Sequence, residues 1–187
     1  MSKTRLNSIT TTCIPSEKIC NNMVTLRLAT VADIALIQEI SEKTWPVSYK
    51  GIITPEQIRY MLDRMYSTSN IEQAILDSNQ AFWLAEKDGQ AVGFCGIEHH
   101  HPEAHFTRIH KLYVLPDTHG MGIGKRLLEQ VEKQALFHAD THLHLNVNKN
   151  NKAVDFYRRH GFSIASEEVL DIGNGFVMDD FIMTKAL

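Results

Sequence analysis

A glycine-rich loop between a strand pattern and a helix pattern constrains this chain more than any other feature. Glycine stands at every second position of the segment 120–124. This segment follows the strand pattern of 106–115 and leads into the helix pattern of 122–137. Glycine backbone lets N–H groups approach an anion closely, and the start of a helix adds the positive end of its dipole. Lys125 and Arg126 bring positive charge to this first turn, although it opposes the dipole there. The loop therefore predicts a site for a bound anion.

Two common phosphate-binding loops do not match this segment. A Walker A loop has four residues between its glycines, whereas Gly120 and Gly124 enclose only three. It also has Ser or Thr after its lysine, where this chain has Arg126. A Rossmann fingerprint has its third glycine where Lys125 stands and is followed by further βα units, which the pattern does not show. A glycine-rich helix start without any ligand is the remaining alternative.

Alternating and helical hydrophobic periods along the rest of the chain predict one α/β domain. We expect Pro46 to end the first helix and Asp88-Gly89 to form a hairpin turn. The order of elements in the second half favours a mixed, twisted central sheet of about seven strands flanked by helices, with parallel pairing around a crossover. The predicted strands are 24–28, 81–86, 91–97, 106–115, 142–147, 162–169 and 176–185, and the predicted helices are 34–45, 55–65, 71–76, 122–137 and 150–160.

The first 22 residues differ in composition from the rest. Residues 1–22 are rich in Ser and Thr, show no periodicity and contain no hydrophobic stretch of the signal-peptide type. We expect a poorly ordered N-terminal extension there and a single domain over residues 23–187. The basic residues Lys3, Arg5 and Lys18 leave a transit peptide as an alternative.

Charge and cysteine content exclude several classes of protein. The 187 residues carry 22 acidic and 19 basic side chains, a net charge of −3, which lacks the basic balance of a nucleic-acid binder. No apolar run approaches the ~18 residues of a membrane span, so we expect no membrane association. Cys13, Cys20 and Cys95 form no CxxC pair, which favours a reducing compartment and predicts a cytoplasmic protein.

Ten histidines raise the question of a metal site. The consecutive residues His99 to His101 cannot all face one site in an extended chain. His142 and His144 share a strand face, but no Cys or carboxylate at ligand spacing accompanies them. We therefore predict no metal.

Two motifs together resemble the GNAT family of N-acetyltransferases. The segment His119-x-x-Gly122-x-Gly124 is similar to the Arg/Gln-x-x-Gly-x-Gly/Ala pyrophosphate loop of that family, with His119 in place of Arg or Gln. About thirty residues later, the segment 150–162 resembles the second motif, Asn-x-x-Ala-x-x-Phe-Tyr-x-x-x-Gly-Phe. The closing Met-x-Lys-x-Leu of 183–187 is also similar to family C-termini. The resemblance covers residues 24–187 and implies the GNAT fold and transfer of an acetyl group from acetyl-CoA to an amine.

The resemblance also implies which residues hold acetyl-CoA. The loop would bind the pyrophosphate, the backbone of 112–114 would pair with the pantetheine arm like an added strand, and two asparagines would contact its amides. The implied cofactor-binding residues are Leu112, Tyr113, Val114, His119, Gly120, Met121, Gly122, Ile123, Gly124, Lys125, Asn146, Asn150 and Tyr157.

Two residues are candidates for proton transfer. The resemblance implies that the hydroxyl of Tyr157 lies beside the CoA sulfur, as a general acid or a hydrogen-bond donor to the leaving thiolate. His110 is the candidate general base, because a side chain with a pKa near ~6.5 suits a base at neutral pH. Strand alternation predicts that His110 shares a face with Arg108, Leu112 and Val114. A core tyrosine and a partly buried strand histidine are the structural alternatives.

The acceptor amine is less well defined by the sequence. Trp45 and Tyr49 occupy the stretch that shapes the acceptor pocket in relatives, and their rings could stack on a cationic amine. We expect a primary amine of a small molecule, polyamine-like or other, although no acidic cluster in the sequence marks a polyamine groove. Acetylation of protein N-termini or lysines, and a CoA-binding regulatory module without turnover, are the alternatives. A second copy of the chain, in a homodimer, is the only macromolecular partner we consider.

Overall fold

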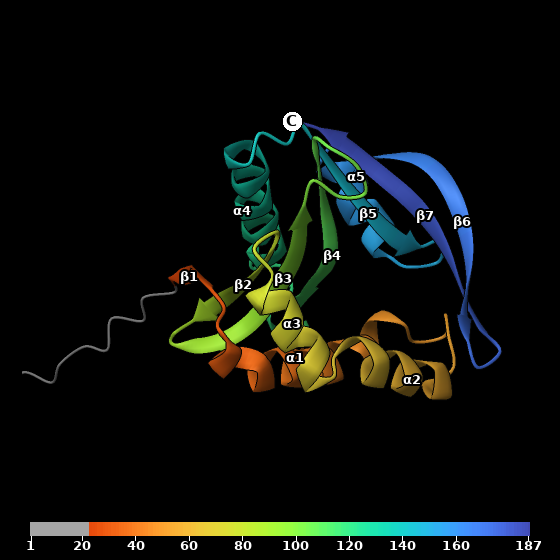
Figure 1. Cartoon of the computed structure of the whole chain (residues 1–187). Helices are drawn as coiled ribbons and strands as arrows, with labels where there is room; N and C mark the ends of the chain where they lie inside the picture. Colours follow the sequence, from red (N-terminus) through yellow and green to blue (C-terminus); the bar gives the residue numbers. More distant parts are fainter. Residues whose placement is uncertain (1–22) are drawn as a thin grey trace, which may run out of the picture.

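The fold is organised around the one parallel pair of strands in a seven-stranded sheet, as seen in a computed structural model that describes residues 23–187. The strand order is β1-β2-β3-β4-β5-β7-β6, and every pair other than β4–β5 is antiparallel. The long β6–β7 hairpin curves away at the edge of the sheet (Figure 1). The strands are β1 (Val24–Leu28), β2 (Gln80–Lys87), β3 (Gln90–His99), β4 (Phe106–Val114), β5 (His142–Asn148), β6 (Ser163–Gly173) and β7 (Phe176–Ala186). The predicted mixed α/β sheet is thus confirmed.

Five α-helices cover the two faces of this sheet. They are α1 (Ile34–Ser48), α2 (Pro55–Met65), α3 (Thr68–Leu76), α4 (Ile123–Phe137) and α5 (Ala153–Arg159). Neighbouring residues of β3 show the division, because Phe94 belongs to a buried cluster with α1, α2 and α3, and Cys95 to one with α4 and α5. Figure 1 shows α1, α2 and α3 grouped together at the bottom of the view. No helix within residues 23–187 has the length and apolar character needed to cross a membrane.

Three predicted helix boundaries were wrong, and one of them is the start of α3, which begins at Thr68, three residues before the predicted start. Pro46 lies inside α1, which continues to Ser48, because the loss of one N–H donor is offset by burying Trp45 and Tyr49, 1% and 8% exposed. Helix α5 begins at Ala153 instead of residue 150, because asparagine side chains before it accept hydrogen bonds from the backbone N–H groups in short turns. The predicted Asp88-Gly89 hairpin turn is confirmed. The expectation for residues 1–22 lies outside the described residues.

A β-bulge interrupts the pairing of β3 with β4. Ile97 pairs with Ile109 and the adjacent Gly96 pairs with Lys111, so His110 is the extra residue. Arg108, which precedes the bulge, and the bulged residue His110 line a cavity on the α1–α2 side of the sheet. After the bulge, Leu112 and Val114 pack against the cluster of α4 and α5 instead. The predicted common face for these four residues was therefore wrong, because one inserted residue reverses the alternation.

Strands β4 and β5 pair over only part of their length. Their register runs from Phe106 opposite His142 to Ile109 opposite Leu145, whereas β4 continues to Val114 and β5 to Asn148. The other edge of β4 stays paired with β3 as far as Val114. The segment 112–114 therefore has one backbone edge that does not pair with β5, and this edge is where an extended ligand could add as a strand.

Strand β3 and the end of β4 approach each other closely at Gly93. A Cβ built at Gly93 would lie 2.8 Å from the carbonyl oxygen of Tyr113, a backbone atom that moves only if the strands separate. A Cβ at Gly96 would meet the ring of Phe82 at 2.9 Å, and a side chain can shift at lower cost. We expect Gly93→Ala to lower the free energy of unfolding by roughly 1–3 kcal/mol, and by more than Gly96→Ala does. Urea denaturation of the two variants tests this order, and equal losses would contradict it.

Candidate active site

The glycine loop has the geometry expected of an anion site. Gly120 and Gly122 have φ values of +82° and +76°, a left-handed conformation that favours glycine, and Gly122 is the N-cap of α4. The N–H groups of Ile123 and the next two residues have no partner within the helix, because they belong to its first turn. A Cβ at Gly120 or Gly122 would have open space around it, so the backbone there is reachable from outside.

The side chains of the loop are arranged differently from one another. His119 turns back toward β4, where its Nε2 lies 3.0 Å from the carbonyl oxygen of Val114. Lys125 is exposed, with its Nζ 3.6 Å from Glu129. Ile123 is buried in the core and Met121 is exposed. The backbone N–H groups and the side chain of Lys125 are therefore the donors that this loop presents to the outside.

Tyr157 lies in α5, within the buried cluster that also contains Val147 of β5. Its ring makes edge contacts with Phe156 and Phe162, and the side chain is 7% exposed. Burial raises the pKa of Tyr157 above its ordinary value, so the phenol keeps its proton at neutral pH. The hydroxyl has no hydrogen-bond partner among residues 23–187 in the structure, and it is free to donate to a ligand.

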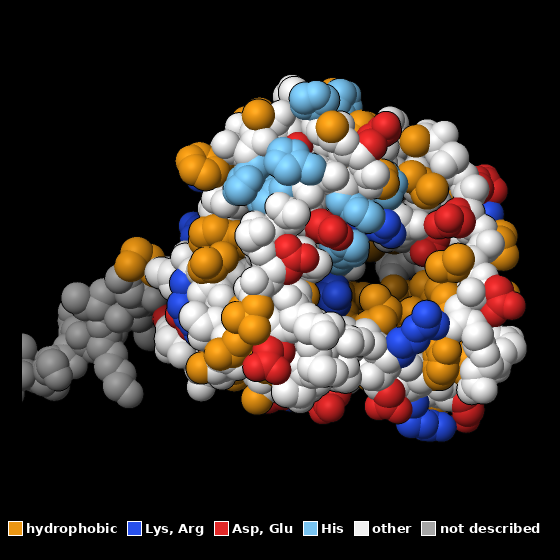
Figure 2. Space-filling view, viewed as in Figure 1, with side chains coloured by type: hydrophobic (Ala, Val, Ile, Leu, Met, Phe, Trp, Pro, Cys, Tyr) orange, Lys and Arg blue, Asp and Glu red, His pale blue; other side chains and the backbone are white. Residues whose placement is uncertain are grey.

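A cavity of about 310 Å³ opens between the α1–α2 pair and the strands β4 to β7. Figure 2 shows a hollow near the middle of the view, with histidine, basic and acidic side chains around it and hydrophobic side chains within. Trp45, Tyr49 and His110, which the sequence analysis singled out, line this cavity together with residues that it did not assign to the acceptor. The lining residues are Trp45, Tyr49, Met61, Arg64, Met65, Arg108, Ile109, His110, Tyr113, Asn146, Glu168, Leu170, Ile172, Met178 and Asp180.

His110 is held by a carboxylate that the sequence analysis missed. Its Nε2 lies 2.7 Å from Oε2 of Glu98, the residue that precedes the histidine run. Burial lowers the pKa of His110, as do the positive charges of Lys111 and Arg108, while the hydrogen bond to Glu98 opposes the shift. A neutral imidazole in this position donates its Nε2–H to Glu98 and keeps the lone pair of Nδ1 free. Such a histidine can accept a proton.

Asn146 is engaged at both ends of its amide. Arg108 Nη2 donates to Oδ1 at 3.2 Å, and Nδ2 donates to Oε2 of Glu168 at 2.9 Å. Asn150, the other asparagine, follows β5, and its backbone N–H donates to the side chain of Asn148 at 3.0 Å. Asn146 therefore lies in the cavity lining, between Arg108 and Glu168. Asn150 lies in the turn that leads to α5.

Two carboxylates meet at the cavity wall formed by β6 and β7. Glu168 and Asp180 are direct cross-strand partners, an arrangement of like charges that costs stability. Burial raises the pKa of Asp180 to about 6, with the charges of Glu168 and Asp179 adding to the shift. Oδ1 of Asp180 is buried and has no hydrogen-bond partner within the described part of the chain. This pair of carboxylates was not visible in the sequence, because hairpin pairing joins residues twelve positions apart.

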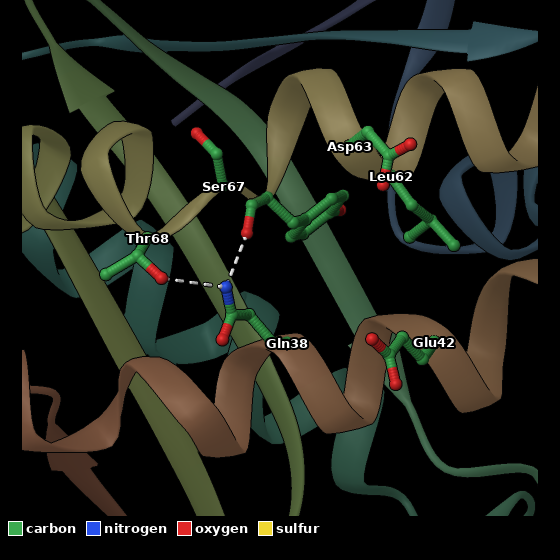
Figure 3. A pocket seen from close by; sticks show the side chains of 7 residues that line it. Gln38, Glu42, Leu62, Asp63, Ser67 and Thr68 are labelled. Atoms are coloured by element: carbon green, nitrogen blue, oxygen red, sulfur yellow. Dashed lines mark hydrogen bonds between the residues drawn. The ribbon is translucent and has the colours of Figure 1, made fainter.

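A second cavity of about 310 Å³ lies between α1 and the α2–α3 pair. Gln38 crosses it, with Nε2 donating to the carbonyl oxygen of Tyr66 at 2.8 Å and to Oγ1 of Thr68 at 3.4 Å (Figure 3). Glu42 and Asp63 are the acidic residues that line it. None of the predicted site residues lies there, so the first cavity remains the candidate site.

The histidine run is divided between two surroundings. His100 Nδ1 lies 2.8 Å from Oδ1 of Asp140, and the ring of His99 stacks on that of His138 with centroids 3.8 Å apart. His101 is on the cavity side, where its Nε2 lies 3.1 Å from Arg108. No three His, Cys, Asp or Glu residues within 23–187 are arranged to hold a metal ion.

Comparison with known proteins assigns this arrangement to a family. The model of the acetyltransferase (GNAT) domain family matches residues 50–180. An uncharacterised N-acetyltransferase of Mycobacterium tuberculosis (strain ATCC 25618 / H37Rv) is 26% identical over 158 residues, 84% of this chain and 99% of the relative. A spermidine N(1)-acetyltransferase of Thermoplasma acidophilum is 25% identical over 161 residues, 83% of this chain and 96% of the relative.

A solved structure agrees with the sequence comparison. The crystal structure of PaiA N-acetyltransferase from Thermoplasma acidophilum, in complex with coenzyme A, superposes with a TM-score of 0.76 at 25% identity. The match covers 88% of this chain and 99% of that one. The family implied by the two sequence motifs is confirmed, and so is the use of acetyl-CoA as acetyl donor. The chain belongs to the GNAT family and is an acetyl-CoA-dependent N-acetyltransferase.

Proposed function

We propose that this enzyme acetylates the primary amine of a small molecule that binds in the cavity lined by Trp45 and His110. The observation that carries the proposal is the wall of that cavity, where Glu168 and Asp180 face each other next to a histidine–carboxylate pair. Two adjacent carboxylates attract an ammonium group. A recessed cavity of about 310 Å³ also suits a small ligand better than a protein surface.

The chain offers matching groups for acetyl-CoA. The free N–H groups at the start of α4, with Lys125, would bind the pyrophosphate, and the backbone edge of 112–114 would pair with the pantetheine amides. Acetyl-CoA supplies the thioester whose acetyl group is transferred. In this arrangement the N–H of Val114 is the donor for the thioester oxygen, and Asn150 borders the arm from the side of β5.

Two side chains divide the proton transfers between them. A primary amine has a pKa near ~10.4 and reaches the site protonated. His110 takes one proton on Nδ1 while Glu98 holds Nε2–H, and the free amine then forms a C–N bond to the thioester carbonyl carbon. As the C–S bond breaks, the second proton of the attacking nitrogen passes to the departing sulfur, with Tyr157 as the hydrogen-bond donor or the relay for it. Transfer is direct, because Cys95, the one cysteine within residues 23–187, is buried and its pKa is raised to about 12.

The cellular setting of the proposal follows from the same residues. We place the enzyme in the cytoplasm, since Cys95 is a buried free thiol and the three cysteines form no CxxC pair. A homodimer is supported by β6, an edge strand on which Val169 and Leu170 are exposed. Neither a nucleic acid nor a membrane is part of the proposal.

The role of the loop is tested by Gly122→Val. Valine is strained at a φ of +76° and will pull the first turn of α4 out of its anion-binding geometry, so affinity for acetyl-CoA should fall about tenfold or more. Gly175→Val is a matched control, because Gly175 has a φ of +77°, open surroundings and a position in the β6–β7 turn. Calorimetry should show normal affinity for the control. A folded Gly122→Val protein with unchanged affinity would refute the assignment.

Release of CoA thiol tests the reaction itself. We expect acetyl-CoA turnover with small amines such as spermidine or 2-phenylethylamine, and little with a lysine-containing peptide. Tyr157→Phe should lower kcat about ten- to a thousandfold with little change in KM for acetyl-CoA, because it removes a contact made to the leaving sulfur. Preference for the peptide would instead assign the enzyme to protein acetylation, and binding without any turnover would indicate a regulatory module.

The pH profile tests His110. The base must be neutral, so kcat/KM should fall as the pH drops through the pKa of His110, which burial places below the ordinary value near 6.5. His110→Ala should remove this acidic limb and leave a rate that rises with pH as the amine loses its own proton. His142→Ala, outside the cavity, is the control. If His110→Ala keeps the original rate and profile, another group or water takes the proton.

A further inference from the structure

We propose that the acceptor is an α-amino acid or a close analogue, and that Arg108 binds its carboxylate. The inference rests on the proposed function, because it takes the cavity lined by Trp45 and His110 as the acceptor site. It adds a second recognition element, an anion-binding group beside the carboxylates that attract the amine.

Arg108 is a charged side chain that forms no ion pair within residues 23–187, although Glu98 stands opposite it in the β3–β4 pairing. It lines the cavity, and its guanidinium contacts Nε2 of His101 at 3.1 Å and Oδ1 of Asn146 at 3.2 Å. No carboxylate among residues 23–187 forms an ion pair with it, whereas Arg27 is bound by both Asp33 and Glu86. A guanidinium has five N–H donors in a planar fork that matches a carboxylate. Arg108 therefore retains donors for an anionic ligand.

The positive and negative groups of the cavity lie close together. Asn146 accepts a hydrogen bond from Arg108 and donates one to Glu168, so a single side-chain amide separates the guanidinium from the carboxylate. Asp180 lies next to Glu168 and has a buried oxygen without a partner. An α-amino acid carries its ammonium and its carboxylate on one carbon atom. These two groups match a site in which opposite charges are one amide apart.

The remaining lining suits an apolar side chain on the acceptor. Trp45, Tyr49, Met61 and Met65 supply aromatic and thioether groups on the helical side of the cavity. A polyamine is a poorer match, because its second ammonium would meet the unpaired charge of Arg108 or that of Arg64, which also lines the cavity. The observations thus favour an apolar α-amino acid over a polycation.

Matched acceptor pairs test this inference. L-Phenylalanine, L-methionine and L-leucine are each compared with the amine that lacks only the carboxylate: 2-phenylethylamine, 3-(methylthio)propylamine and 3-methylbutylamine. Spermidine is included as the polycation. The measured quantity is the ratio of kcat/KM for an acid to that for its amine, in the full-length enzyme and in Arg108→Gln. Comparing the two enzymes cancels the different pKa values of the amino groups. Arg59→Gln, an exposed arginine paired with Glu56, is the control.

For at least one acid, we expect the ratio of kcat/KM for the acid to that for its amine to fall about tenfold or more in Arg108→Gln. The same ratio should stay unchanged in Arg59→Gln. The inference is overturned if no acid shows that loss, or if Arg108→Gln lowers the rates for acid and amine equally, which indicates a structural role. Turnover of spermidine or the simple amines without this effect leaves the acetyltransferase proposal standing and refutes the carboxylate site. If nothing is acetylated, calorimetry of the three acids with CoA present decides: binding that Arg108→Gln abolishes supports the site, and no binding refutes it.

Discussion

The departure of β4 from β5 after Ile109 and Leu145 is the constraint on which the rest of this site depends. The pair is parallel, and its crossover places α4 with its glycine loop at the end of β4. Once the strands separate, the backbone edge of 112–114 is open to an extended ligand, and Tyr157 belongs to the buried cluster against which Leu112 and Val114 pack. The bulge at His110 follows directly and moves Leu112 and Val114 to the other face of the sheet, while His110 lines the acceptor cavity. One local break in pairing therefore organises both halves of the site.

Several features of the cavity lower the stability of the folded protein and are explained by ligand binding. Glu168 and Asp180 are like charges placed opposite each other, and the buried oxygen of Asp180 lacks a partner. Arg108 forms no ion pair within residues 23–187, while exposed residues elsewhere in this part of the chain form ordinary pairs such as Lys43 with Glu39. Natural proteins depart from consistent local rules mainly at functional sites. A ligand with complementary charges would satisfy these groups together.

Most of the fold could be predicted from local patterns. The seven strands and five helices were located from periodicity, and the Asp88-Gly89 turn was predicted from residue type alone. The end of α1 was predicted too early, at Pro46, because a local rule about proline does not take account of the burial of Trp45. Similarly, the Tyr157 motif was visible in the sequence, whereas Glu98 gave no signal because its importance comes from one contact with His110.

The sequence by itself determined the family, the glycine loop at the start of α4 and the order of strands and helices along the chain, because each depends on residues close together along the chain. Tertiary structure alone decided which side chains share the acceptor cavity. The reason is register: a bulge at His110 and another near the β6–β7 turn, between Asp171 and Gly173, each shift the pairing by one residue. A shift of one residue moves every later side chain to the other face. Counting outward from the Asn174-Gly175 turn would therefore have paired Glu168 with Phe181, not with Asp180.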